Sequence, residues 1–391
     1  MNDLSRPTAV LLLAGRSRRT WPLTADFPKP LLPLWGRPLT ERALDQLEGV
    51  VDTAVLVVGH GRERILAHFG DRYRSIRLVP VVQRTARGTA DALRVAAPLV
   101  SDRALVMNGD DYYHGEDLAR VSRFPTAILC QEATDPWNRA TVEVTGDDWL
   151  VDLEEKPPSA RPGELSSIGA YSLRREDLAH LGEVGESVRG ELELPDLIRI
   201  LIRLPGVRAV RARHPWIPLT YAWDVVGRVA PLFAGKPPWL GTALGFATTD
   251  GGLGSGARHI APGGRVAEDA WLVGPVEVAE GARIGAAARV ERTVLLRGAR
   301  IGRGAVVSDS VLGPGAVVGA GARVRSGRVE RIQVLGHEAR VGVERVGACL
   351  GERASVPAGA VTPPGLLLGP GERFDAVLAT ATGTAGTPTP D

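Results

Sequence analysis

Short, predominantly apolar runs alternate with amphipathic stretches through the first part of the chain, up to about residue 235. The apolar runs predict buried strands, at Ala9–Leu13, Thr53–Gly59, Ile76–Val82, Ala104–Met107 and Thr126–Leu129. Between them, Leu39–Leu47 and Arg62–His68 have the spacing of helices. This alternation predicts a doubly wound, mostly parallel α/β sheet, and ligands of such sheets bind beside the carboxyl ends of the strands.

The pattern changes in the second part, where glycine and valine increase and helical periodicity is lost. Aliphatic residues recur at every sixth position, in the series Val266, Leu272, Val278, Ile284, Val290 and the series Val306, Leu312, Val318, Val324. Gly-Ala pairs precede aliphatic residues at a constant offset, beginning at Gly281, Gly298, Gly304, Gly315 and Gly321 and leading to Ile284, Ile301, Val307, Val318 and Val324. Six residues form one flat side of a triangular coil, with glycine suited to the tight corners. The repeat predicts a left-handed parallel β-helix.

The sequence therefore predicts an α/β domain at 1–235, a Pro/Gly-rich linker at 236–256, a β-helix domain at 257–378 and a disordered tail at 379–391. The chain has 391 residues, which is enough for two domains with their own cores. We expect the repeat domain to act as an assembly module, so that the protein forms a homo-oligomer through the β-helix.

Composition narrows the class of protein. Hydrophobic residues make up 44% and charged residues 24% of the chain, which is typical of a folded protein. The net charge of +2 does not favour nucleic acid as a partner. No apolar run approaches the roughly 20 residues of a membrane span. Cys130 and Cys349 lack metal-ligand spacing and predict no disulfide framework, so we expect a cytoplasmic protein.

Candidate chemistry begins directly after the first predicted strand. The loop Leu13-Ala14-Gly15 offers backbone N–H groups to phosphate oxygens. Arg19, and Lys29 within Pro-Lys-Pro, can neutralise charge on a reacting triphosphate. An ordinary basic turn is the alternative for the loop alone, and its coupling to Pro-Lys-Pro favours phosphate chemistry.

Two further segments follow predicted strands. Gln83 carries an amide that suits a pyrimidine edge, and Gly88 lets the backbone approach a base, although a polar helix cap from Thr89 is an alternative. Asp110 ends a strand, where a carboxylate can hold Mg²⁺ beside a triphosphate; the alternative is a turn aspartate.

Glu155 and Lys156 form an acid–base pair before a proline. Glu155 can accept hydrogen bonds from sugar hydroxyl groups, and Lys156 can bind a phosphate. Taken alone, however, the pair is more typical of a charged, solvent-exposed turn.

In order and spacing, these motifs resemble the sugar-1-phosphate nucleotidyltransferase family, in its thymidylyl- and uridylyltransferase-like form with a C-terminal left-handed β-helix. The matching segments are Leu12–Thr24 with Pro28–Pro30, Gln83–Ala90, Val106–Asp110, Leu153–Pro157, Gly169–Tyr171 and Arg189–Asp196. The resemblance implies a nucleotidyltransferase domain over 1–235. It implies catalytic roles for Arg19 and Lys29, and Mg²⁺ binding by Asp110. It implies nucleotide binding by Leu13, Ala14, Gly15, Gln83, Gly88 and Thr89, and sugar-phosphate binding by Glu155, Lys156, Gly169, Tyr171 and Glu191.

Two positions depart from the family pattern. Ser17 stands where the family has a second glycine, and serine fits there if the backbone avoids positive φ. Pro218 stands where the family has a second metal-binding aspartate, and proline cannot coordinate a cation. Either Asp111 or Asp224 completes the Mg²⁺ shell, or catalysis is weakened.

The resemblance implies attack by a sugar 1-phosphate on the α-phosphorus of a nucleoside triphosphate, giving a nucleotide-sugar and pyrophosphate. Because guanylyl members of the family more often lack the glutamine at Gln83, dTTP or UTP is favoured. The alternative is a catalytically impaired paralogue that binds nucleotide-sugar and regulates a partner enzyme, which Ser17 and Pro218 favour. An acyltransferase in the β-helix is less favoured, because Arg303 stands where such enzymes carry a histidine base.

Overall fold

The computed structural model describes residues 5–204, 206–230 and 253–375. By their contacts these residues form two compact units. The first comprises the described residues up to Arg16 together with Leu39–Ile217, and the second comprises Ser17–Pro38 and the described residues from Pro218 onward. The predicted tail at 379–391 and most of the predicted linker at 236–256 lie outside the described residues. The predicted boundary near 235 therefore stays a prediction, but the loop Ser17–Pro38 groups with the C-terminal unit.

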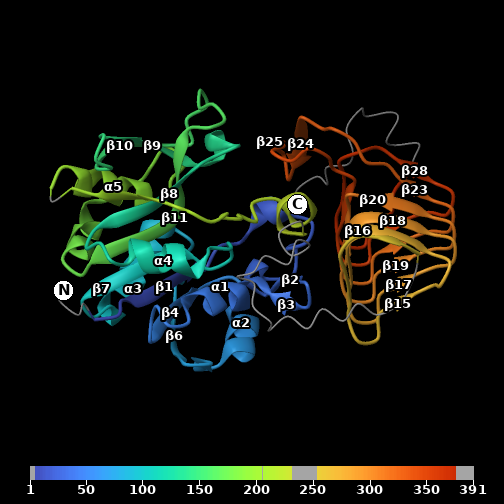
Figure 1. The fold of residues 1–391 in the computed structure, drawn as a ribbon, viewed down its shortest axis with the longest axis horizontal. Coiled ribbons are helices and arrows are strands. Elements are labelled where there is room, and N and C mark those ends of the chain that lie inside the picture. Colours follow the sequence, from blue (N-terminus) through green and yellow to red (C-terminus); the bar gives the residue numbers. More distant parts are fainter. Residues whose placement is uncertain (1–4, 205, 231–252, 376–391) are drawn as a thin grey trace. The chain divides into compact units, whose positions relative to one another are not determined.

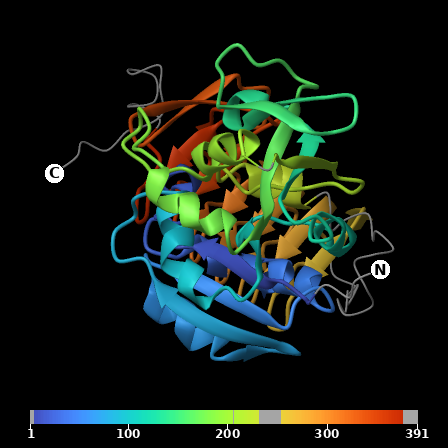
Figure 2. The same cartoon turned by 90° about the vertical axis from the view of Figure 1, so that its left-hand side faces the viewer.

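The first unit is built on a mixed, mostly parallel sheet (Figures 1 and 2). Its parallel centre is β1 (Thr8–Leu13), β4 (Thr53–Val58), β6 (Ile76–Val82) and β7 (Arg103–Asn108), in the order β7-β1-β4-β6. Antiparallel pairing joins the remaining strands to this centre, apart from the parallel pair β8–β12. These strands are β5 (Arg72–Tyr73), β8 (Ala127–Glu132), β9 (Ala140–Val144), β10 (Leu150–Glu155), β11 (Leu165–Arg174) and β12 (Arg208–Arg211). The predicted, mostly parallel α/β sheet is confirmed, and it is a mixed, Rossmann-like sheet.

Helices pack on the sheet in two sets. α3 (Thr89–Ala96) contacts α5 (Leu194–Ile202), and α1 (Leu39–Leu47) contacts α4 (Gly115–Val121). α2 (Arg62–Phe69) contacts β6. Alternate residues of the central strands pack with α3 and α5 in one apolar core. Because successive strand side chains point to opposite faces, both faces of the sheet are covered, and this explains why the central strands are apolar without a polar alternation.

The second unit stacks short parallel strands in successive rungs (Figure 1). One ladder contains β15 (Arg265–Val266), β17 (Arg283–Ile284), β19 (Arg300–Ile301), β22 (Val317–Val318) and β27 (Ser355–Val356). The other contains β13 (Leu253–Ser255), β14 (Arg258–Ile260), β16 (Trp271–Val278), β18 (Arg289–Leu295), β20 (Val306–Ser308), β21 (Val311–Leu312), β23 (Arg323–Val324), β26 (Ala348–Leu350), β28 (Val361–Thr362) and β29 (Leu366–Leu368). This stacking is that of a parallel β-helix. Antiparallel hairpins are β2 (Pro33–Leu34) with β3 (Arg37–Pro38), and β24 (Arg331–Val334) with β25 (His337–Arg340).

The repeat pattern maps onto these rungs. The five glycines that begin the Gly-Ala pairs all have positive φ, between 65° and 71°, and each alanine that follows is fully buried. The aliphatic residues at the constant offset are also buried. One residue of the six-step series is corrected: Val307 points into the core and Val306 is only partly buried, because the offset from Gly304 sets the inward position.

Candidate active site

The carboxyl ends of the central strands in the first unit meet at one edge. At Gly59, which follows β4, a Cβ would lie 2.8 Å from the carbonyl oxygen of Ala14, so these two strand ends are in close contact. The N–H of Gly109, which follows β7, donates to the carbonyl of Leu12 at 3.3 Å. The N–H of Gln83, which follows β6, donates to the carbonyl of Val58 at 2.9 Å. Residues predicted from three separate motifs therefore lie along the same edge.

The phosphate-loop prediction rests on Leu13-Ala14-Gly15 at the end of β1. Leu13 and Ala14 are buried, whereas Gly15 is exposed. A Cβ at Gly15 would meet no atom of the described residues within 4 Å, and the φ of Gly15 lies outside the left-handed region. The fold itself therefore does not require glycine at this position. A phosphate group that approaches the backbone closely would require it, because a side chain would obstruct the approach.

The Gln83 side chain is held in one orientation. Its amide nitrogen donates to the carboxylate of Asp91 at 2.9 Å and to the carbonyl of Gly88 at 3.1 Å. Asp91 is itself paired with Arg94. Both amide donors are thus engaged, which leaves the carbonyl oxygen of this largely buried side chain as its remaining hydrogen-bonding atom. Sequence reasoning missed Asp91, whose role depends on the first turn of α3 facing Gln83.

Gly88 is required by the fold. Its φ is +113°, and a Cβ there would lie 2.3 Å from the carbonyl oxygen of Leu192. Leu192 exchanges backbone hydrogen bonds with this loop, donating to Arg87 at 2.7 Å and accepting from Ala90 at 2.9 Å. The hydroxyl of Thr89 accepts from the N–H of Leu194 at 3.0 Å, at the start of α5. The predicted base loop and the predicted sugar loop are therefore joined through the backbone.

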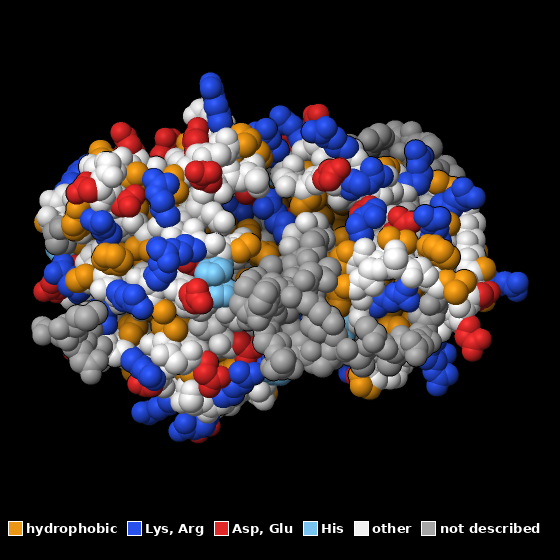
Figure 3. Space-filling view, in the orientation of Figure 1, with side chains coloured by type: hydrophobic (Ala, Val, Ile, Leu, Met, Phe, Trp, Pro, Cys, Tyr) orange, Lys and Arg blue, Asp and Glu red, His pale blue; other side chains and the backbone are white. Residues whose placement is uncertain are grey.

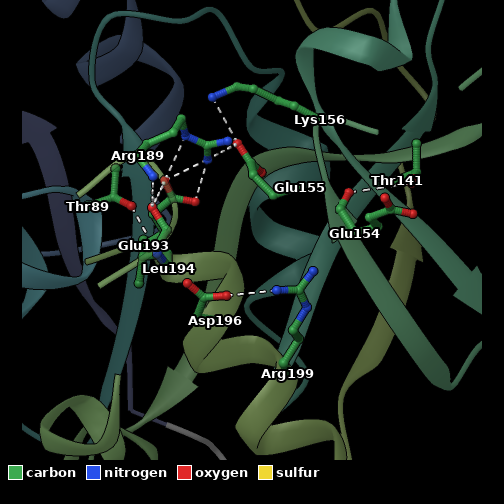
Figure 4. Close-up of polar contacts among 11 residues, drawn as sticks. Thr89, Thr141, Glu154, Glu155, Lys156, Arg189, Glu193, Leu194, Asp196 and Arg199 are labelled. Atoms are coloured by element: carbon green, nitrogen blue, oxygen red, sulfur yellow. Dashed lines mark hydrogen bonds and ion pairs between the residues drawn. The ribbon is translucent and has the colours of Figure 1, made fainter. Parts of the chain in front are cut away.

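The sugar-side candidates form a charged network (Figure 4). The ammonium group of Lys156 lies 3.0 Å from the Glu155 carboxylate, and the Arg189 guanidinium lies 3.4 Å from the same oxygen. Arg189 also pairs closely with Glu193, at 2.5 Å and 2.6 Å. Lys156 is one-third exposed and has a left-handed φ of +51°, a strained conformation that often marks a functional position. Two cations that share carboxylates can turn towards a phosphate dianion.

The network uses a different acid from the one that the sequence favoured. Glu191 is exposed, and its side chain makes no hydrogen bond or ion pair with another described residue. Glu193 is buried and binds Arg189, so Arg189 and Glu193 are the residues that sequence reasoning missed. Tyr171 lies in the apolar core with its hydroxyl beside Ser167, while Gly169 has a φ of +77° and abuts the Asn108 amide. Gly169 therefore lies by the strand edge, and Tyr171 does not reach the surface.

An acidic turn follows β7. Asp110 is partly exposed, and Asp111 is buried, with the amide of Asn108 donating to it at 3.1 Å. Burial raises the pKa of the neighbouring Tyr113 phenol, and the negative charges of Asp111 and Asp110 add to that effect. Of these two acids Asp110 is the more exposed to solvent, which a divalent cation approaching from solvent favours.

The segment around Pro218 belongs to the second unit. Pro218 is buried. The Asp224 carboxylate accepts from the N–H groups of Thr220 and Tyr221, at 2.9 and 2.8 Å, and pairs with Arg228 at 3.0 Å. Asp224 is 2% exposed, so both of its oxygens serve the fold. Asp111 and Asp224 are thus both buried and hydrogen-bonded, and the expectation that one of them completes a metal shell stays a prediction.

The two predicted catalytic cations lie on the loop Ser17–Pro38 of the second unit. Arg19 is exposed, in the 3-10 turn Arg18–Thr20, and Lys29 is largely buried at the start of the 3-10 turn Lys29–Leu31. Ser17 has φ +51°, which is the left-handed conformation that the sequence analysis expected serine to avoid. Its carbonyl accepts from Thr20 N–H and from the Thr24 hydroxyl, at 3.1 and 2.9 Å. These bonds hold the glycine-like conformation.

The surface carries no large field of one sign on the face drawn in Figure 3, where basic and acidic side chains are interspersed. Among the described helices, none combines the length and the apolar character needed to cross a membrane.

The sheet and its edge define a Rossmann-like nucleotidyltransferase domain, and comparison with known proteins agrees. The Nucleotidyl transferase family matches residues 8–236, and the family described as GMPPB C-terminal domain matches residues 255–353. The first match covers more than half of the chain, so the protein belongs to the nucleotidyl transferase family.

Individual relatives share parts of this chain. It is 29% identical over 219 residues to bifunctional protein GlmU of Methanococcus maripaludis, covering 56% of this chain and 52% of that protein. It is 31% identical over 202 residues to UTP–glucose-1-phosphate uridylyltransferase AglF of Haloferax volcanii, covering 50% of this chain and 83% of that protein. A solved UDP-glucose pyrophosphorylase complexed with UDP-glucose shares the fold, with a TM-score of 0.51 at 18% identity over 57% of this chain and 96% of that one. The chain spans about half the length of the GlmU relatives it matches.

Proposed function

We propose that this protein transfers a nucleotidyl group from a nucleoside triphosphate to a sugar 1-phosphate. The observation that carries the proposal is the pair of backbone hydrogen bonds that join Leu192 to Arg87 and Ala90, on either side of Gly88. It joins the loop that orients Gln83 to the loop that carries Arg189, whose guanidinium reaches Glu155 beside Lys156. A base-reading amide and a pair of phosphate-binding cations are thereby set at a fixed distance, as joining a nucleotide to a sugar phosphate requires.

The reaction needs no covalent enzyme intermediate. A phosphate oxygen of the sugar 1-phosphate forms a bond to the α-phosphorus, the bond from that phosphorus to the bridging oxygen breaks, and its electron pair leaves on pyrophosphate. Lys156 and Arg189 would hold the attacking phosphate. Arg19 and Lys29 would neutralise charge on the triphosphate and on the leaving pyrophosphate.

Uridine and thymidine triphosphates suit the Gln83 amide best. Since both of its donors are engaged, its carbonyl oxygen can accept the N3–H of uracil or thymine. Cytosine presents a lone pair at that ring position and would be repelled. The N–H of Gly88 makes no hydrogen bond to another described residue, which leaves it as a donor for a base carbonyl.

Magnesium fits the acidic turn through one carboxylate. Mg²⁺ is commonly held by one or two carboxylates together with phosphate oxygens and water, and Asp110 provides one accessible carboxylate. Bound there, the ion would neutralise phosphate charge as the reaction proceeds.

The hexapeptide period also supports a left-handed β-helix. We infer that this domain assembles the protein into a homo-oligomer, and a measurement of the molecular mass in solution would test this.

A second candidate function rests on Pro218. Because this buried proline replaces a metal-binding aspartate and Asp224 is fully engaged, the chain fits a paralogue that binds nucleotide-sugar and regulates a partner enzyme. Retention of Arg19, Lys29, Asp110 and Lys156 supports the enzyme, because a protein that only binds product needs no lysine for the leaving group, which is the role proposed for Lys29.

The deciding experiment measures pyrophosphate release from UTP, dTTP, CTP, ATP and GTP with a panel of sugar 1-phosphates, with and without Mg²⁺. We expect Mg²⁺-dependent release with UTP or dTTP. Absence of turnover with every pair, together with measurable nucleotide-sugar binding by calorimetry, would overturn the enzyme and support the paralogue.

A further inference from the structure

The β-helix contains a buried carboxylate that contacts the loop carrying Arg19 and Lys29. Glu277, on β16, is 1% exposed. Its two oxygens accept the backbone N–H groups of Trp35, at 2.7 Å, and of Gly36, at 3.0 Å. These residues are far apart in sequence, yet they lie within the same compact unit.

Trp35 and Gly36 form a strained turn. They are the two-residue connection between β2 and β3, and their φ angles are +52° and +72°. Positive φ at both central positions is the geometry of a type I′ hairpin turn, in which asparagine, aspartate and glycine are usual. A tryptophan with positive φ is an outlier, and such strain persists only where surrounding structure imposes it. The Glu277 carboxylate imposes it by binding both N–H groups of the turn.

The tryptophan side chain is fixed by the β-helix as well. Trp35 is 2% exposed, and its ring lies 5.8 Å from that of His259 on β14, centroid to centroid. A Cβ at Gly36 would approach the His259 ring at 3.0 Å, so the turn sits directly against this strand. The hairpin begins at Pro33, directly after Leu32, whose backbone N–H donates to the carbonyl of Lys29 at 2.9 Å, so a short hydrogen-bonded segment joins the hairpin to Lys29.

The same loop has a second anchor beside Arg19. Trp21 follows the turn Arg18–Thr20, and the backbone N–H of Trp21 donates to the carbonyl of Arg18 at 3.2 Å. A Cβ at Gly369, which follows the last strand of the β-helix, would lie 3.0 Å from the Trp21 ring. Each predicted catalytic cation is therefore close in sequence to a tryptophan that packs on the β-helix.

We propose that Glu277 is a positioning residue for nucleotidyl transfer, through which the β-helix holds the loop bearing Lys29 and Arg19 in its reactive conformation. The inference rests on the proposed function for its kinetic consequence. The mechanism is local: the carboxylate holds the Trp35–Gly36 turn, the turn fixes the hairpin, and the hairpin fixes Lys29. The β-helix thereby serves the reaction without touching substrate.

Glu277→Gln tests the proposal, because glutamine keeps the size of the side chain but replaces one carboxylate oxygen with an amide NH₂ group. That group would face a backbone N–H of the Trp35–Gly36 turn, and two donors cannot form a hydrogen bond. We expect kcat to fall about 10- to 100-fold, since Lys29 and Arg19 act on charge that develops during the reaction. The KM for sugar 1-phosphate should change less than twofold, because Glu155, Lys156 and Arg189 lie in the first unit. Glu280→Gln is the matched control, since its side chain is 65% exposed and pairs only loosely with Arg297, at 3.5 Å.

Hydrogen exchange gives a readout that does not depend on activity. In the full chain, we expect the amides of Trp35 and Gly36 to exchange faster in Glu277→Gln, on a peptide covering residues 33–38, while the β-helix peptides keep their protection. Gly369→Ala provides an independent variant, because its added methyl group crowds Trp21 and should lower kcat without touching Glu277.

The outcomes separate the two proposals. If Glu277→Gln leaves kcat within twofold of the parent, or lowers it without faster exchange at residues 33–38, the positioning role is overturned. If the parent protein releases no pyrophosphate with any substrate pair, the proposed function fails, while the exchange measurement still decides whether Glu277 holds the turn.

Discussion

Replacing Gly15 with alanine should separate nucleotide binding from folding. In the part of the chain that the structure describes, a Cβ at this position meets no atom within 4 Å, and the backbone is outside the left-handed region. At such a compatible position, Gly→Ala stabilises a protein by about 0.4–1 kcal/mol, because it restricts the unfolded chain. For a unit of this size that corresponds to a rise in Tm of roughly 1–4 °C.

Binding should change in the opposite direction. The added methyl group would lie where the loop backbone meets phosphate oxygens, and forcing a methyl group into a close contact costs about 1–3 kcal/mol. That cost is roughly a 5- to 150-fold rise in Kd. Calorimetric titration with UTP or dTTP measures the affinity, and a thermal melt without ligand measures the Tm.

Gly88→Ala is the contrasting variant. Here the Cβ would lie 2.3 Å from the Leu192 carbonyl oxygen, and φ is +113°. The strained backbone alone costs about 1–3 kcal/mol, so the Tm should fall by several degrees together with affinity. Normal nucleotide affinity in Gly15→Ala, with a Tm at or above that of the parent, would refute the phosphate-loop assignment. A fall in its Tm like that of Gly88→Ala would refute the geometric reasoning.

Three further predictions concern neighbouring groups. Asp91→Ala should free the Gln83 amide to flip, and we expect the preference for UTP over CTP, measured as a ratio of kcat/KM, to fall about tenfold, in line with loss of one charge-assisted hydrogen bond. Asp110→Asn should raise the Mg²⁺ concentration for half-maximal pyrophosphate release at least tenfold, and an unchanged Mg²⁺ titration would remove Asp110 as the ligand. Burial lowers the pKa of the His114 imidazole, and the neighbouring His214 lowers it further. The unfolded chain therefore binds a proton at this histidine more readily than the folded protein does. Stability should consequently fall as pH drops below about 6.5. His114→Asn keeps an acceptor for the helix-capping N–H and should flatten this fall in melts between about pH 7 and 5, whereas an unchanged slope would place the titration elsewhere.

The sequence was most informative where a local pattern decides the structure. Helix Leu39–Leu47 and strand Ile76–Val82 have the predicted bounds, because amphipathic spacing and a largely apolar run are properties of the segments themselves. The corner glycines of the β-helix were predictable for the same reason, since each rung repeats the same local geometry. The strand expected at Thr126–Leu129 is found at Ala127–Glu132, because pairing with β11 and β12 extends it through polar residues.

The site was less predictable wherever segments that are distant in sequence determine which way a side chain points. The run Glu191-Leu192-Glu193 offers two acids, and nothing local states which one faces the network. Pairing of the Leu192 backbone with the base loop decides it, leaving Glu191 exposed and turning Glu193 towards Arg189. Likewise, the Trp35–Gly36 turn has no usual turn sequence at its first position, and the carboxylate that accepts both of its N–H groups, Glu277, is distant in sequence.

The two departures from the family pattern have different physical consequences. Ser17 adopts a left-handed conformation that glycine would adopt without strain, so serine adds strain of about 1 kcal/mol at this position. Pro218 instead stands where the resemblance places an oxygen ligand, and the Asp224 carboxylate is already engaged by the Thr220 and Tyr221 amides. Any impairment of catalysis should therefore appear in the dependence on Mg²⁺ and not in nucleotide affinity. A Mg²⁺ titration of the unmodified protein consequently distinguishes the enzyme from the regulatory paralogue more directly than restoring glycine at Ser17 would.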